Sequence, residues 1–142
     1  MKQEVKVIIS GMQGENVGND QIQVVSVGQM YEKDNFTCVT YDEVVDEEEN
    51  GVVQVVKNLI KINDEQVEVI KKGPVKSHMV FVPEQTTYTY YSTPIGELEV
   101  GVHTRSIDRS KRSNGFGLKL RYDLEMNQSF ISSCSVNIAV EV

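Results

Sequence analysis

The sequence predicts an all-β protein, a closed or nearly closed up-and-down antiparallel β-barrel of about 8–10 strands. Short segments in which apolar and polar residues alternate recur along the whole chain, with turn residues between them. No segment of ten residues has a convincing helical pattern. An open meander leaves two exposed edges, and closure into a barrel removes them. We therefore expect one domain over residues 1–142, with the last strand paired to the first.

The composition is that of a soluble globular protein, with 39% hydrophobic and 25% charged residues. A chain of 142 residues can bury about two-thirds of its unfolded surface. The net charge of −7 argues against a nucleic-acid partner, because phosphates require a basic surface. No apolar run approaches the roughly 20 residues that span a bilayer, and the first ten residues alternate instead of forming a signal sequence. We expect a cytoplasmic protein without a membrane partner.

Three strands are predicted in the first third of the chain. Val5, Val7 and Ile9 alternate with other residues, and the next two segments are rich in β-branched and aromatic residues. Gly28 could mark a bulge. These strands are residues 4–11, 21–30 and 36–43, separated by a loop at 11–20 and a hairpin turn at 32–35.

Residues 42–49 hold six acidic side chains and no basic one. Such clustering predicts a solvated tip, with Asn50 and Gly51 in a turn. A calcium loop would need carboxylates at alternating positions and a glutamate at the twelfth, a pattern that is missing. We predict no metal site.

Residues 52–63 are the most ambiguous segment. Val52, Val55, Val56, Leu59 and Ile60 could form a helical stripe, but the four valines favour a strand. A strand here predicts a hairpin with residues 66–72, after a turn at Asn63 and Asp64.

The second half contains the clearest hairpin. Residues 89–105 end one strand, turn at 93–96 and complete a second strand in which Leu98, Val100 and Val102 share a face. A long loop is predicted at 107–116. The remaining predicted strands are 77–82, 85–92, 118–126 and 130–142.

Several short motifs occur in a familiar order: Gly73, Met79-Val80-Phe81, Tyr91-x-Thr93-Pro94-x-Gly96, Gly101, Thr104 and Leu120-x-Tyr122-x-Leu124. Through them the chain resembles the bacterial DUF1934 family, also called YwiB-like, over nearly its whole length. The resemblance implies a calycin-like barrel, related in architecture to lipocalins and fatty-acid-binding proteins. The family has no established catalytic or ligand residues to transfer, and the lipocalin Gly-x-Trp signature is absent because the chain has no Trp.

A barrel of this size either fills with side chains or holds one small ligand. Tyr122 shares the inward parity of its strand, so its hydroxyl needs a partner, for which Thr104 or Ser77 is suited. The sequence predicts a non-catalytic binding module for a small apolar or amphipathic molecule. The alternative is a protein–protein interaction barrel with a filled core. The predicted lumen site comprises Ser77, Met79, Phe81, Tyr91, Thr104 and Tyr122.

No catalytic residue and no cofactor is predicted. His78 and His103 fall on the outward parity of their strands, and a zinc site needs more ligands than two. Cys38 and Cys134 are predicted to be buried thiols, and a single disulfide bond between them is the alternative. Tyr88, Tyr90 and Tyr91 suit cross-strand packing or a stacking platform.

Residues 105–121 contain six basic residues and one acid, Asp108. This basic segment contrasts with the acidic tip. The two patches could steer an acidic partner to one end of the barrel or mediate homo-oligomerisation, and a solvated loop is the simpler reading.

Overall fold

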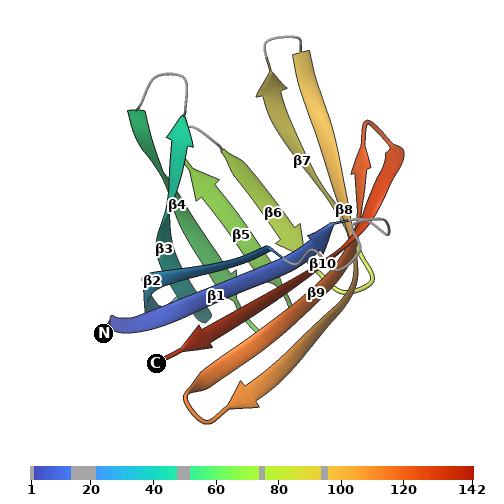
Figure 1. The fold of residues 1–142 in the computed structure, drawn as a ribbon. Helices are drawn as coiled ribbons and strands as arrows, with labels where there is room; N and C mark the ends of the chain where they lie inside the picture. Colours follow the sequence, from blue (N-terminus) through green and yellow to red (C-terminus); the bar gives the residue numbers. More distant parts are fainter. Residues whose placement is uncertain (1, 14–21, 48–51, 74–75, 94–95) are drawn as a thin grey trace.

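The computed structural model describes residues 2–13, 22–47, 52–73, 76–93 and 96–142. These residues form an all-β structure of ten antiparallel strands in a nearly closed barrel (Figure 1). The predicted fold class is confirmed, and residues 52–62 form a strand as predicted. The strands are β1 (Gln3–Gln13), β2 (Ile22–Lys33), β3 (Phe36–Glu47), β4 (Val52–Ile62), β5 (Val67–Lys72), β6 (Ser77–Phe81), β7 (Thr86–Thr93), β8 (Gly96–Arg112), β9 (Gly115–Met126) and β10 (Ser129–Glu141).

Except for β6 and β7, consecutive strands pair with one another, and β10 also pairs with β1, as predicted. Lys6 lies opposite Glu141 and Gln13 opposite Cys134, so most of β1 pairs with the second part of β10. The sheet instead ends at β6 and β7, which are consecutive in the chain. The barrel therefore opens in the middle of the sequence and not at its termini.

The seam between β6 and β7 is bridged by side chains. The Thr87 hydroxyl donates to the carbonyl oxygen of Val80 and the Thr89 hydroxyl to that of His78, each at 2.5 Å. The turn between the strands contributes one backbone bond, from Gln85 N to Val82 O at 3.0 Å. Among the described residues, hydroxyl groups take the place of a backbone ladder here.

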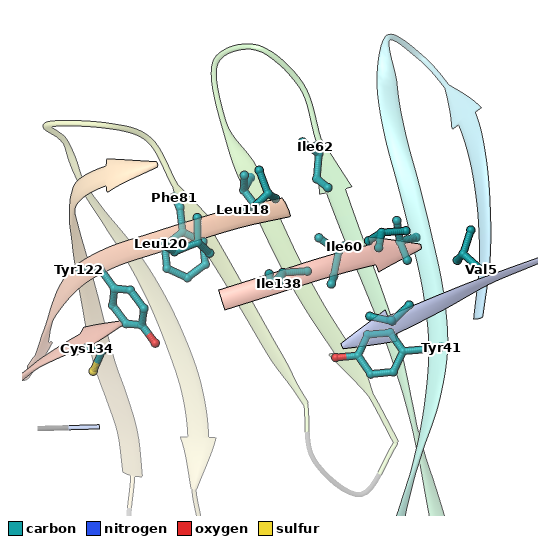
Figure 2. Packing of buried hydrophobic residues seen from close by; sticks show 14 of the residues in the cluster. Val5, Tyr41, Ile60, Ile62, Phe81, Leu118, Leu120, Tyr122, Cys134 and Ile138 are labelled. Atoms are coloured by element: carbon teal, nitrogen blue, oxygen red, sulfur yellow. The ribbon is translucent and has the colours of Figure 1, made fainter. Parts of the chain in front are cut away.

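The core is the inward face of nearly every strand. Figure 2 shows Phe81, Leu120 and Tyr122 at one side of the cluster and Tyr41 and Val5 at the other. Period-two alternation supplies this face, because successive side chains of a strand point to opposite sides. The most deeply buried large side chains are Val7, Val39, Val56, Ile60, Val67, Val102, Leu120 and Val140.

Two sequence predictions are wrong. The long loop at 107–116 is the second half of β8 and the start of β9. A bulge at Arg105 shifts the register between Thr104 and Ser106 and restores an inward position for Ile107, opposite Leu120. The charged residues that suggested a loop lie on an exposed strand end.

Gly28 is not a bulge, since neither ladder shows a register shift there; it is the residue at which the pairing of β2 with β3 ends. A Cβ at this position would lie 2.2 Å from the carbonyl oxygen of Thr40. The glycine permits the close approach of β2 to β3.

Candidate functional site

Three cross-strand rows of side chains cross the inner face of all four strands from β3 to β6, and the rows differ in polarity. The first two rows are almost wholly apolar, and the third, toward the acidic end of β3, is polar. The rows are Thr37–Ile62–Val67–Phe81, Val39–Ile60–Val69–Met79 and Tyr41–Asn58–Lys71–Ser77. We call the third the polar row.

Asn58 is the centre of the polar row and is 2% exposed. Its amide nitrogen donates to the Val56 carbonyl oxygen at 3.3 Å and to Glu43 Oε1 at 3.4 Å. Lys71 Nζ donates to the same Glu43 oxygen at 3.4 Å. Burial, together with the Glu43 carboxylate, raises the pKa of the Tyr41 phenol. A neutral phenol, an amide and an ion pair thus share one wall of the lumen.

The other end of the Asn58 amide is unsatisfied. Asn58 Oδ1 is buried and has no hydrogen-bond partner among the described residues. The assignment of the amide is fixed by its surroundings, because the nitrogen faces two acceptors. A buried carbonyl without a donor costs free energy. The polar row therefore contains a hydrogen-bond acceptor that no described residue uses.

A groove leads to the polar row from the seam. It has a volume of about 430 Å³ and lies between the ends of β5 and β6 and the middle of β7, where the β7–β8 hairpin diverges from β5–β6 (Figure 1). Lys71 and Ser77 belong both to the groove and to the polar row. Its lining is Ile70, Lys71, Lys72, Lys76, Ser77, His78, Thr89 and Tyr90.

The predicted lumen residues are brought only partly together. Phe81 and Tyr122 pack edge to face with ring centroids 4.9 Å apart, and Thr104 lies opposite Tyr122 in the pairing of β8 with β9. These three are buried. Met79 packs against the core, and Ser77 is half-buried opposite Lys71.

The expected partner of the Tyr122 hydroxyl is wrong. Thr104 Oγ1 has no hydrogen-bond partner among the described residues, so it does not bond with Tyr122, and Cys134 lies opposite Tyr122 on β10. Burial and the neighbouring Cys134 thiol raise the pKa of the Tyr122 phenol. The strand position of Tyr91, opposite Leu98, is described, but its side chain is outside the described part of the structure.

Comparison with known proteins places the chain in a family. Residues 6–138 match the model of a domain of unknown function, DUF1934. The chain belongs to the DUF1934 family. It is 29% identical over 128 residues to the uncharacterized β-barrel protein YwiB of Bacillus subtilis (strain 168), covering 89% of this chain and 86% of that protein.

The crystal structure of the ywiB protein from Bacillus subtilis has the same fold as this DUF1934 chain. The two superimpose with a TM-score of 0.72 at 23% sequence identity, over 99% of this chain and 92% of the other. The family is thus one of uncharacterised small β-barrel proteins.

The outer face of the DUF1934 barrel carries a second polar row, Thr86–His103–Asp123–Ser133, across β7 to β10. The Thr86 hydroxyl and His103 Nδ1 are 2.8 Å apart. Asp123 accepts from Arg105 Nη2 at 2.6 Å and from Ser133 Oγ at 2.9 Å. Hydrogen bonds from Arg105 and Ser133 lower the pKa of the Asp123 carboxyl. One carboxylate oxygen of Asp123 binds Arg105, the bulged residue, and the other binds Ser133. These contacts stabilise the bulge at Arg105.

The histidines are not brought together. His78 Nε2 lies 2.9 Å from Glu68 Oε1 on the outer face, whereas His103 contacts Thr86. Among the described residues no three metal-ligating side chains gather. No helix in the described chain has the length and hydropathy to cross a membrane.

Both cysteines are buried free thiols, and burial raises the pKa of Cys38. Tyr88 and Tyr90 are 53% and 62% exposed on the outer face of β7. The pKa of Tyr90 is raised by the neighbouring Glu99 carboxylate.

Sequence reasoning missed the polar row apart from Ser77. A signal was present, because Asn58 is in phase with Val56 and Ile60, and Lys71 with Val67 and Val69. Polar residues on the apolar parity of three strands mark a polar inner wall only once the register places them side by side.

Proposed function

We propose that this protein is a non-catalytic binding module for a small amphipathic molecule held on the inner face of the barrel. The observation that carries the proposal is the unpartnered carbonyl of Asn58, which is buried on the inner wall and lies opposite Lys71, a residue that also lines an open groove. Buried polar groups are normally satisfied, so an exception opposite a residue that lines a groove is a candidate ligand contact.

The polar row suits the polar end of the ligand. A hydroxyl or amide of the ligand would donate to Asn58 Oδ1, while Lys71 and Ser77 would donate to its acceptor. Glu43 neutralises Lys71, so a neutral head group is favoured over an anion.

The apolar row next to the polar row suits the tail. Val69 and Met79 lie one step further along β5 and β6, and both are half-buried. Methionine adapts readily to ligands of different shape. Entry would follow the groove at the seam, where the Thr87 and Thr89 hydroxyl bonds connect β7 to β6.

A second candidate is a protein-interaction barrel whose core is filled. It is favoured by large apolar side chains on the surface, among them Phe130 at 65% and Ile131 at 50% exposure. Neighbouring exposed apolar residues often mark protein contacts.

Native mass spectrometry of freshly purified protein, combined with solvent extraction and analysis of the extract, tests the proposal. We expect a small amphipathic compound with the wild-type protein and about tenfold lower occupancy in Asn58→Leu, which removes the acceptor. Gln29→Leu, on the exposed face of β2, is the matched control and should retain the compound.

Two outcomes would count against the proposal. A wild-type protein that releases no compound and does not take up added 1-dodecanol would remove its basis. Equal occupancy in Asn58→Leu would show that the polar row is not the site. A dimer mass without bound compound would favour the second candidate.

A further inference from the structure

The outer face of the barrel contains a hollow that is separate from the lumen. It crosses β8, β9, β10, β1 and β2 and has a volume of about 360 Å³, within the range of about 300–1,000 Å³ typical of small-molecule sites. Its floor contains a cross-strand row of mostly small residues, Ile8–Ala139–Gly117–Ser110. The hollow exists because Ala139 and Gly117 present little or no side chain.

Gly117 also allows its neighbours to lie across the floor. A Cβ on this residue would meet Ser110 Oγ at 2.7 Å and the guanidinium of Arg112 at 3.4 Å. Arg112 is oriented in addition by Glu141, with Nη1 and Oε1 3.9 Å apart. The serine and the arginine thus extend over β9 toward the hollow.

One rim of the hollow is a polar cross-strand row. Ser10 on β1, Asn137 on β10 and Lys119 on β9 lie opposite one another, with Gln23 beyond Ser10 and Asp108 beyond Lys119. Arg109 and Arg112 complete the lining from β8. All of these residues are on strands, so the arrangement is held by the backbone ladder.

The chemistry of the lining is dominated by hydrogen-bond donors. Three cations, two hydroxyls and two amides line one hollow, in a protein of net charge −7. Asp108 is its one acidic lining residue, and Glu141 is engaged with Arg112. Arginine, lysine and hydroxyl donors recognise the oxygens of a phosphate, which accepts but does not donate when fully ionised.

We propose that this outer hollow binds a small ligand through its phosphate group, with Lys119 and Arg112 as the charged contacts. Ser10, Ser110 and Asn137 supply neutral donors. The volume leaves room for an organic group beside the phosphate. This site lies on the wall opposite to the inner face and does not depend on the proposed lumen function.

NMR titration of ¹⁵N-labelled protein tests the site. The probes are inorganic phosphate, glycerol 3-phosphate and, as a neutral control, glycerol. We expect saturable shifts for the phosphates confined to the outer rows of β1, β8, β9 and β10, and none with glycerol. Tighter binding of glycerol 3-phosphate would identify an ester as the ligand, and equal binding would identify the free anion.

Variants distinguish a built site from general charge attraction. Lys119→Gln should weaken binding about tenfold through loss of a charged contact. Ala139→Leu fills the hollow without changing any charge and should abolish binding. Lys33→Gln, which removes one positive charge from the β2–β3 hairpin, should leave binding unchanged.

The proposal is overturned by shifts spread over all basic residues, by equal weakening in Lys119→Gln and Lys33→Gln, or by no saturable shift at concentrations up to about 1 mM. The spectra show directly whether Ala139→Leu is folded. If Ala139→Leu is not folded, the phosphate affinities of Lys119→Gln and Lys33→Gln test the proposal without it.

Discussion

Thr104 on β8 lies directly opposite Tyr122 on β9, yet their buried hydroxyls are not hydrogen-bonded to each other. Thr104 Oγ1 has no hydrogen-bond partner among the described residues. Thr104 is 0% exposed. The hydroxyl is therefore desolvated without compensation.

Thr104→Val should raise the free energy of unfolding by about 1 kcal/mol, because it removes an unpaired buried hydroxyl at nearly constant shape. Urea denaturation followed by circular dichroism measures the change. Thr87→Val is the matched control and should be destabilising, since the Thr87 hydroxyl donates to the Val80 carbonyl oxygen. A Thr104→Val protein less stable than wild type would mean that the hydroxyl has a partner in solution.

Replacing both Thr87 and Thr89 by valine should loosen the seam. Their hydroxyl bonds to β6 are removed while β-propensity is kept. Amide hydrogen exchange of residues 77–81 should accelerate by about tenfold or more, since two hydrogen bonds of about 1 kcal/mol each hold that edge. Thr40→Val, where no side-chain bond is seen in the described structure, should leave this exchange unchanged. Unaltered exchange in the double variant would show that β6 is held by its pairing with β5 alone.

Asp123 should make stability dependent on pH in the acid range. Its folded pKa lies below the ordinary value of 3.8, so it stabilises the protein above that value, and this contribution is lost as pH falls through the lowered pKa. At neutral pH, Asp123→Asn should cost about 1–2 kcal/mol, moderated because Arg105 is largely exposed. Between pH 7 and pH 2, the free energy of unfolding should fall less steeply for Asp123→Asn than for the wild-type protein, as measured by denaturation at each pH. Asp42→Asn, at an exposed position, should show the wild-type pH dependence. The same pH dependence in all three proteins would contradict the role given to Asp123.

Gly28→Ala should be strongly destabilising. The added Cβ would lie 2.2 Å from the Thr40 carbonyl oxygen, so β2 and β3 must separate. We expect a loss of about 2 kcal/mol or more in the free energy of unfolding. Gly11→Ala is the control, because its Cβ would meet its nearest neighbour at an ordinary 3.5 Å. Thermal denaturation compares the two, and equal melting temperatures would show that the sheet yields at Gly28 without cost.

The alternation in the sequence determined the fold class and most of the core. Val100, Val102, Leu120 and Tyr122 were predicted to face inward, and all four are buried. This prediction succeeds because the side-chain period of a strand is a property of the backbone itself. The pairing of the last strand with the first followed from the need to remove exposed edges.

Only the tertiary structure decided where the barrel opens and which polar groups meet. The bulge at Arg105 turned a presumed loop into a long strand, and the register of β3 to β6 aligned Tyr41, Asn58, Lys71 and Ser77. Alternation determines the face of the sheet on which a residue lies, but it does not determine which residue of the next strand lies opposite. That register depends on the packing of all ten described strands together.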